Sequence, residues 1–267
     1  MFRTPAVAGN FYPASPQTLE RQVEGLLEKA PSRVKAIGVL VPHAGYVYSG
    51  GVAGRVYSRI IVPEVVVLLG PNHTGVGPDI SVFVEGTWQM PSGEVAVETD
   101  LARSFLNLAR TAREDYRAHH DEHSLEVQIP FLQRFRPDLA IVPITMMTTR
   151  LEACREVGGA LAGAVAAYPK KVLLVASSDM THYESDGSAR KKDRKAIEKI
   201  LELDPEGLHA AIRQWGISMC GFAPTVAMLF AAKSLGAVAA DLVDYRTSGE
   251  VSGDFDQVVG YAGVVIR

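Results

Sequence analysis

Three histidines that each follow an apolar run are the residues of this 267-residue sequence best suited to chemistry. His43 follows AIGVLVP and His73 follows VVVLLGPN, and both stand close to glycines. His182 comes after KVLLVA in the turn SSDMTH, with Asp179 ahead of it. Open α/β sheets present polar site residues where strands end in turns of this kind. Neutral imidazoles delivered in this way are typical metal ligands, so His43 and His73 are candidate ligands.

A third metal ligand is not determined by spacing. Cys220 stands at the start of an expected helix, where the helix dipole would lower the pKa of its thiol. A thiolate suits iron, copper or zinc and rejects magnesium and calcium. The alternative is that Cys220 is a small buried apolar residue, as free cysteines usually are. The candidates for the third ligand are Cys220, Asp179, His182 and the cluster Asp121-Glu122-His123.

Asp179 and His182 have the spacing of two residues that share one face of a helical turn. In that arrangement the carboxylate of Asp179 would hold the His182 imidazole in one tautomer, as a general acid or base requires. The alternative is a helix N-cap formed by Ser178 or Asp179, which would leave His182 exposed.

His119 and His123 form a rival metal pair, because their spacing suits two ligands on one helix. The residues between them do not complete an HExxH motif. The helix is also expected to begin at Asp121, which would leave His119 outside it. In that case Glu122, His123 and Glu126 would face the crevice formed where the strands end, and would support the metal ligands there.

Two further observations concern the pocket and the reaction class. Tyr46 and Tyr48 could line an aromatic pocket, with ordinary core packing as the alternative. The sequence has no G-x-S-x-G motif, no GxGxxG after a strand and no Walker A motif. These absences disfavour a serine hydrolase, a dinucleotide enzyme and a P-loop protein.

Strands alternate with helices along the chain, which predicts a single domain over 1–267 with a three-layer α/β/α fold and a mostly parallel or mixed sheet. The carboxyl ends of its parallel strands should meet at one edge, where the candidate residues would converge. A proline in the expected strand 139–145 disfavours a central position for that strand. The expected strands are 36–42, 65–70, 80–84, 95–97, 139–145, 171–176, 237–245 and 260–266. The expected helices are 15–27, 50–60, 100–108, 121–135, 151–167, 188–203, 204–215 and 219–235.

Composition narrows the partners and the compartment. The net charge is −3 and the pI is about 6.2, so no nucleic-acid partner is expected. No apolar run approaches the ~18 residues needed to span a bilayer, so no membrane partner is expected. There are two cysteines, Cys154 and Cys220, and no signal-peptide pattern at the start. We therefore expect a cytoplasmic protein with reduced thiols.

Five ordered motifs make the sequence similar to a known family. PHAGYVYSG, LGPNHTG, DEHSLE, SSDMTHY and MCG, together with the opening AVAGNFYPASPQTLERQV, resemble the Memo family over nearly the whole chain. Memo proteins resemble the catalytic domain of class III extradiol ring-cleaving dioxygenases, which use non-haem Fe(II). The resemblance implies metal ligands at His43, His73 and Cys220, an acid/base at His182, and a pocket lined by Asp179, Asp121, Glu122 and His123.

These expectations lead to one functional hypothesis and two rivals. The first is redox or oxygen-dependent chemistry on a small substrate at a mononuclear site, with iron or copper favoured by the thiolate and zinc as the other candidate. The second is a binding module for phosphorylated peptides, since Memo relatives are associated with phosphotyrosine-containing receptor tails. The third is metal-assisted hydrolysis, in which His182 would activate a metal-bound water.

Overall fold

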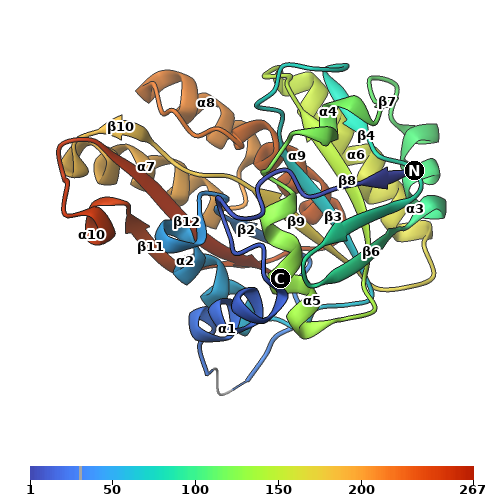
Figure 1. Cartoon of the computed structure of the whole chain (residues 1–267). Helices are drawn as coiled ribbons and strands as arrows, with labels where there is room; N and C mark the ends of the chain where they lie inside the picture. The colour runs from blue at the N-terminus through green and yellow to red at the C-terminus, as the bar shows by residue number, and fades with distance from the viewer. Residues whose placement is uncertain (30–31) are drawn as a thin grey trace.

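A mixed β-sheet between two layers of helices forms the protein, as a computed structural model of residues 1–29 and 32–267 shows (Figure 1). Its parallel centre has the order β8 (Ala140–Met146), β3 (Val65–Pro71), β9 (Val172–Ser177) and β2 (Gly38–Val41). These four strands run in the same direction, so their carboxyl ends share one edge of the sheet.

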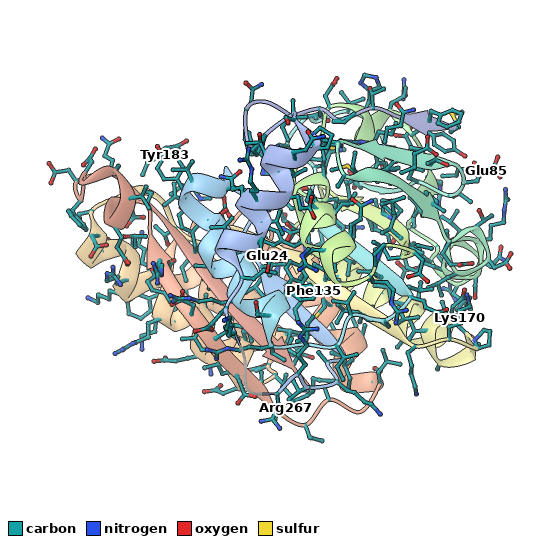
Figure 2. The ribbon with its side chains drawn as sticks, turned by 60° about the horizontal axis from the view of Figure 1, so that its bottom comes forward. Glu24, Glu85, Phe135, Lys170, Tyr183 and Arg267 are labelled. Carbon is teal, nitrogen blue, oxygen red and sulfur yellow. The ribbon has the colours of Figure 1, made fainter. Side chains whose placement is uncertain are left out.

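Antiparallel and shorter strands extend the sheet on both sides. Beyond β8 come β6 (Gly93–Val97), β5 (Thr87–Met90) and β1 (Phe2–Arg3), while β4 (Ile80–Val82) joins β8 to β7 (Arg113–Glu114). Beyond β2 come β12 (Val258–Ile266), β11 (Ala240–Thr247) and β10 (His182–Glu184). Accordingly, Tyr183 of β10 and Glu85 of the β4–β5 turn lie at opposite margins of the molecule (Figure 2).

The two helical layers pack on opposite faces because side chains alternate along each strand. Val67 and Leu69 of β3 join the core under α6 and α9, whereas Val66 and Leu68 join the core under α1, α2 and α5. The first layer is α3 (Thr99–Leu108), α6 (Leu151–Ala167), α7 (Asp186–Leu201), α8 (Pro205–Trp215) and α9 (Phe222–Ser234). The second layer is α1 (Pro16–Leu26), α2 (Tyr46–Ser58) and α5 (Ile129–Phe135). The predicted three-layer fold with a mixed sheet is confirmed.

One predicted helix is wrong in a way that matters for the site. Residues 121–125 are irregular, and the helix expected over 121–135 is a short 3₁₀ turn, η1 (Glu126–Gln128), followed by α5. Pro130 lies in the first turn of α5, where a missing N–H costs nothing. Before this loop stands α4 (Arg117–His120), and α10 (Gly249–Ser252) is a second short helix near the end.

The prediction that the strand around Pro143 avoids the centre of the sheet is also wrong. β8 pairs with β3 along its whole length. On its other side, β6 pairs with Ala140 and Ile141, and β4 pairs with the stretch from Ile144 to Met146. Pro143 falls in the gap between these two partners, where the ladder needs no N–H donor.

The first and last strands, β1 and β12, belong to the same sheet. Among the described residues, no helix is both long and apolar enough to cross a membrane.

Candidate metal centre

Three neighbouring parallel strands deliver the predicted residues to one edge of the sheet. β9 lies between β3 and β2. His73 follows β3, His43 follows β2, and Asp179 follows β9. The expected convergence at the carboxyl edge is therefore present for these three residues.

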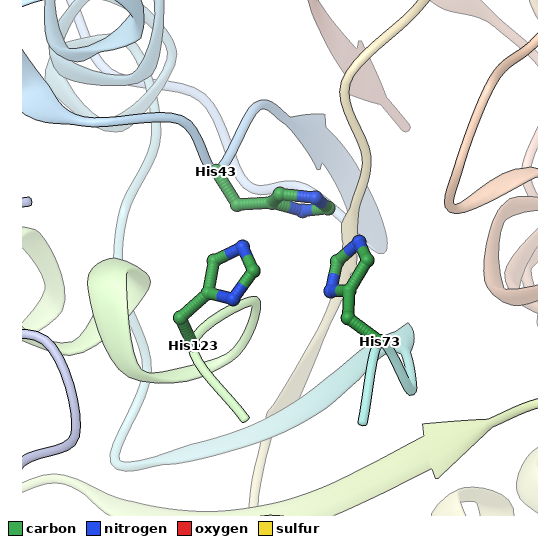
Figure 3. Close-up of side chains that lie close together, drawn as sticks. All are labelled: His43, His73 and His123. Carbon is green, nitrogen blue, oxygen red and sulfur yellow. The ribbon is translucent and has the colours of Figure 1, made fainter. Parts of the chain in front are cut away.

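Three imidazoles gather at this edge, on His43, His73 and His123 (Figure 3). Their candidate ligand nitrogens all lie within 4.8 Å of one another. The His73 and His123 rings stack with centroids 4.6 Å apart, and the His43 ring stands edge-on to both, at 5.2 and 5.5 Å. His43 is buried, His123 is half-buried and His73 is exposed, so the group opens to solvent on one side.

The spacing of these nitrogens is close to what one metal ion needs. Two imidazole nitrogens at about 2.1 Å from a common ion lie at most about 4.2 Å apart. The upper bound of 4.8 Å between the candidate nitrogens is only slightly larger than this distance. The group can therefore hold a metal ion.

Glu122 orients His73. One carboxylate oxygen of Glu122 lies 2.9 Å from His73 Nδ1 and the other accepts the His73 backbone N–H at 2.5 Å. Burial works to raise the pKa of Glu122, but its hydrogen bonds with His73 and with the backbone N–H of Ser124 outweigh burial and bring the pKa to about 2. A carboxylate on Nδ1 leaves Nε2 free and strengthens it as a ligand.

A hydroxyl network sets the tautomer of His43. Ser177 donates its only hydroxyl proton to the Ser124 carbonyl at 2.6 Å. It must therefore accept both of its other hydrogen bonds, from Gln128 Nε2 at 2.9 Å and from His43 Nδ1 at 3.0 Å. His43 consequently carries its proton on Nδ1 and presents the lone pair of Nε2.

Both His43 and His123 are held neutral. Burial lowers the pKa of His43 well below its ordinary value, and the neighbouring rings of His123 and His73 lower it further. Burial also lowers the pKa of His123. Neutral imidazoles bind metal ions without first losing a proton, so His43 and His123 are ready for a cation.

Cys220 touches the group from the side of His43. Its Sγ lies 3.2 Å from His43 Nε2, but Cys220 is not a member of the group of three imidazoles. It lies in a turn before α9, not in the helix itself. The expected lowering of its thiol pKa is wrong, because burial, followed by the nearby Asp179, raises the pKa. The neutral thiol can donate its proton to His43 Nε2.

Asp179 and His182 do not form the predicted pair on a helical turn. Residues 178–181 are irregular and His182 opens β10. Asp179 instead accepts the backbone N–H of His43 at 2.7 Å, so it holds the turn that carries His43. Burial raises the pKa of Asp179 to about 6. His182 takes its orientation from Ser218, whose carbonyl lies 3.0 Å from His182 Nδ1.

Three other candidate residues, His119, Asp121 and Tyr46, lie away from the group of three imidazoles. His119 is fully buried beside Phe83 and Trp88, so it does not form a metal pair with His123. Asp121 lies on the surface, where it contacts His120 Nδ1 at 2.9 Å, and does not line the pocket. Tyr46 is buried in the core, and its hydroxyl donates to the Val127 carbonyl at 2.7 Å. Core packing is therefore the correct interpretation of Tyr46.

His123 is the group member whose weight sequence reasoning underestimated. The sequence offers His123 as one of several candidates for the third ligand, and the resemblance to the Memo family implies a place in the pocket wall for it. The sequence signal for His123 as a ligand is its position directly after Glu122 within DEHSLE, where no continuous apolar pattern indicates a buried helix face. Ser177 and Gln128, which set the His43 tautomer, were not predicted at all.

Comparisons with known proteins identify the family of the chain. The family described as "Memo-like protein" matches residues 3–265. A MEMO1 family protein of Methanopyrus kandleri is 41% identical, covering 100% of this chain and 99% of its own. A MEMO1 family protein of Methanosarcina barkeri is 44% identical over 99% of this chain and 100% of its own.

A solved structure shows a similar fold in a distant protein. An uncharacterized protein of Escherichia coli K12 superposes with a TM-score of 0.53 at 13% identity, covering 85% of this chain and 99% of that one. The match over nearly the whole length and the close relatives decide the family: this chain belongs to the Memo family.

Proposed function

We propose that the protein binds one iron or copper ion at the three-imidazole group and uses it for redox or oxygen-dependent chemistry on a small substrate. The convergence of His43, His73 and His123 carries this proposal. A bound iron or copper ion would supply electron transfer and an open coordination position. Imidazole ligands suit both metals, so the ligand set alone does not choose between them.

Two positions compete to complete the ligand set with His43 and His73. His123 belongs to the same group of nitrogens, and Cys220 brings its sulfur to 3.2 Å from His43 Nε2. The thiol of Cys220 would have to lose its proton on binding a metal, whereas His123 is already neutral. This difference favours His123 as the ligand and Cys220 as a neighbour that the metal can recruit.

His182 is the proposed proton donor or acceptor. Its Nδ1 lies 3.0 Å from the Ser218 carbonyl and must carry the proton there, because a carbonyl only accepts. The lone pair of Nε2 is then available to a substrate. Asp179 supports the site by fixing the backbone at His43, so we propose it as a positioning residue.

Anaerobic metal loading tests this function. The protein is purified without oxygen, titrated with Fe(II) and separately with Cu(I), and analysed for bound metal before oxygen is admitted. We expect one ion per chain, oxygen consumption by the loaded wild type, and neither in His43→Ala. Equal and negligible metal in both proteins would contradict the proposal.

Metal-assisted hydrolysis is a second candidate, favoured by the imidazoles themselves. Three histidines with an open position form a known catalytic zinc site, and His182 could serve as its general base. Stoichiometric zinc in the purified protein, with hydrolysis of test esters and no oxygen consumption, would select this function over redox chemistry.

Peptide binding is the third candidate, and it differs from the other two because it does not require a metal ion. A phosphopeptide-binding module would keep its affinity in Cys220→Ser and His43→Ala. A metal-dependent enzyme would lose activity in His43→Ala.

A further inference from the structure

The segment from Arg3 to Tyr12, which we call the N-terminal strap, joins the loop of His123 to the turn of His43. The strap is far from both in sequence. It begins with Arg3, the last residue of β1, which pairs with β5, and it leads toward α1. Its contacts to the two ligand-bearing segments are made mostly by buried groups.

Arg3 holds the loop that carries His123. Its guanidinium is almost completely buried and stacks over Trp88 at 4.1 Å from the ring centroid. It donates to the backbone carbonyl of His119 at 2.5 Å and to that of Glu122 at 2.6 Å. A planar fork with several donors in fixed directions can hold two carbonyls and a carboxylate at once, which a lysine cannot do.

Glu126 completes the anchor from the other end of the loop. Its carboxylate is fully buried and forms an ion pair with Arg3 at 2.7 Å. It also accepts the backbone N–H groups of Ala6 and Val7, at 2.8 and 3.1 Å, and the hydroxyl of Tyr12 at 2.5 Å. All three donors belong to the strap, so the strap and the loop share one buried polar network.

Phe11 reaches the ligands themselves. Its ring packs against the His123 ring with centroids 4.8 Å apart. Its backbone carbonyl accepts the N–H of Tyr46 at 2.8 Å, at the start of α2 and close to His43. One residue of the strap therefore touches a ligand ring and the turn that delivers a second ligand.

The loop needs this support because it has no regular structure of its own. His43 and His73 follow strands whose hydrogen-bond ladders fix them, whereas residues 121–125 are irregular. We propose that the N-terminal strap is part of the metal centre: Arg3, paired with Glu126, and the ring of Phe11 are positioning residues that set the place of His123 relative to His43. This inference rests on the proposed metal function.

Two variants test the strap. Arg3→Lys keeps the charge but loses the fork, and Phe11→Ala removes the ring while leaving the ion pair intact. The matched controls are Arg103→Lys, whose only ion pair among the described residues is with exposed Glu85, and Phe2→Ala, whose side chain is 73% exposed beside Arg3.

The first measurement needs no metal. Imidazole ¹⁵N–¹H correlation spectra of the metal-free proteins should show shifted or split His123 signals in both strap variants. The signals of His209 should stay in place. This residue lies on α8, in the other helical layer, and its ring contacts the Thr149 carbonyl. A core variant such as Leu161→Ala, which loses stability elsewhere, should leave the His123 signals unchanged and so separates positioning from general loosening.

The second measurement is the affinity for Co(II), followed by its visible absorption. Loss of groups that orient ligands typically weakens metal binding roughly 10- to 100-fold, and we expect that range for Arg3→Lys and the lower end for Phe11→Ala. Both controls should stay within about twofold of the wild type, since neither residue takes part in orienting a ligand.

The outcomes are distinct. Unchanged His123 signals in Phe11→Ala, together with an unchanged Co(II) affinity, overturn the strap proposal, and this variant decides if Arg3→Lys does not fold. If the wild type binds neither Co(II) nor the Fe(II) and Cu(I) of the loading experiment, the proposed function fails, and the spectra of the metal-free proteins alone decide the role of the strap.

Discussion

The two segments that bring histidines to the metal centre are built on different principles. The turns after β2 and β3 are extensions of hydrogen-bonded parallel strands buried on both faces. The loop of residues 117–126 has only one short helix and is held by side chains, above all by Arg3 and Glu126. The two turns and the loop bring their histidines into the same group of three imidazoles. Only the two turns are positioned by the backbone hydrogen bonds of strands.

The difference teaches where a site is sensitive to substitution. A strand end is stabilised by many ladder hydrogen bonds and by the whole core, so a single side chain contributes little to its position. The loop depends on a few buried polar contacts, each of which is costly to leave unmade. Substitutions in the second region should therefore disturb both stability and the site more than substitutions in the first.

The largest expected effect is that of breaking the buried ion pair. Arg3→Met would leave the Glu126 carboxylate buried without its cation, which costs about 3 to 5 kcal/mol of the free energy of unfolding. Urea unfolding followed by circular dichroism measures this. Arg103→Met, which breaks the exposed pair with Glu85, should cost no more than about 1 kcal/mol. Similar costs for the two variants would remove the contrast between buried and surface pairs on which our comparison depends.

A smaller effect is expected where the two regions touch. A Cβ at Gly70, near the end of β3, would lie 2.6 Å from Ser124 Oγ and 2.6 Å from Leu125 Cδ2. Gly70→Ala should therefore cost about 1 to 3 kcal/mol of stability, because the loop must move. Gly159→Ala, in the middle of α6 with open space around it, should instead stabilise by up to about 1 kcal/mol. A neutral Gly70→Ala would show that the loop adapts freely and is not tightly placed.

The smallest effect concerns acid. Burial lowers the pKa of His119 from 6.5 to about 3. Below pH 6.5 the unfolded chain takes up a proton at this residue that the folded chain refuses, so stability falls as the pH falls and is fully present above 6.5. Between about pH 7 and about pH 5.5 the wild type should lose about 1.3 kcal/mol more than His119→Phe. Parallel pH profiles of the two proteins would show that the loop packs His119 less tightly than described.

Much of the fold could be predicted because it follows from local patterns. Apolar runs bounded by breakers gave the central strands, and α6 spans the residues that its Ala-rich pattern indicates. The delivery of His43 and His73 to one edge followed from the parallel order of those strands. Pro143 led to the wrong prediction for the position of β8, because the sequence does not show that this residue falls between two partner strands.

The loop could not be predicted, because its shape depends on a residue more than a hundred positions away. The helix-like pattern of 121–135 hides an irregular start that Arg3 stabilises through backbone carbonyls. For the same reason the sequence pattern alone does not select His123 from the candidates for the third ligand. The raised thiol pKa of Cys220 likewise follows from burial, which outweighs the hydrogen bonds that lower this pKa.

The central claim is that one metal ion is held jointly by the strand-end histidines and the loop histidine. Calorimetric titration of Co(II) into wild type, His43→Ala, His73→Ala, His123→Ala and His209→Ala tests it most directly. We predict one site in the wild type and in His209→Ala, and its loss in each of the other three, with all five proteins folded. Binding that survives unchanged in His123→Ala would contradict the claim that the loop completes the site.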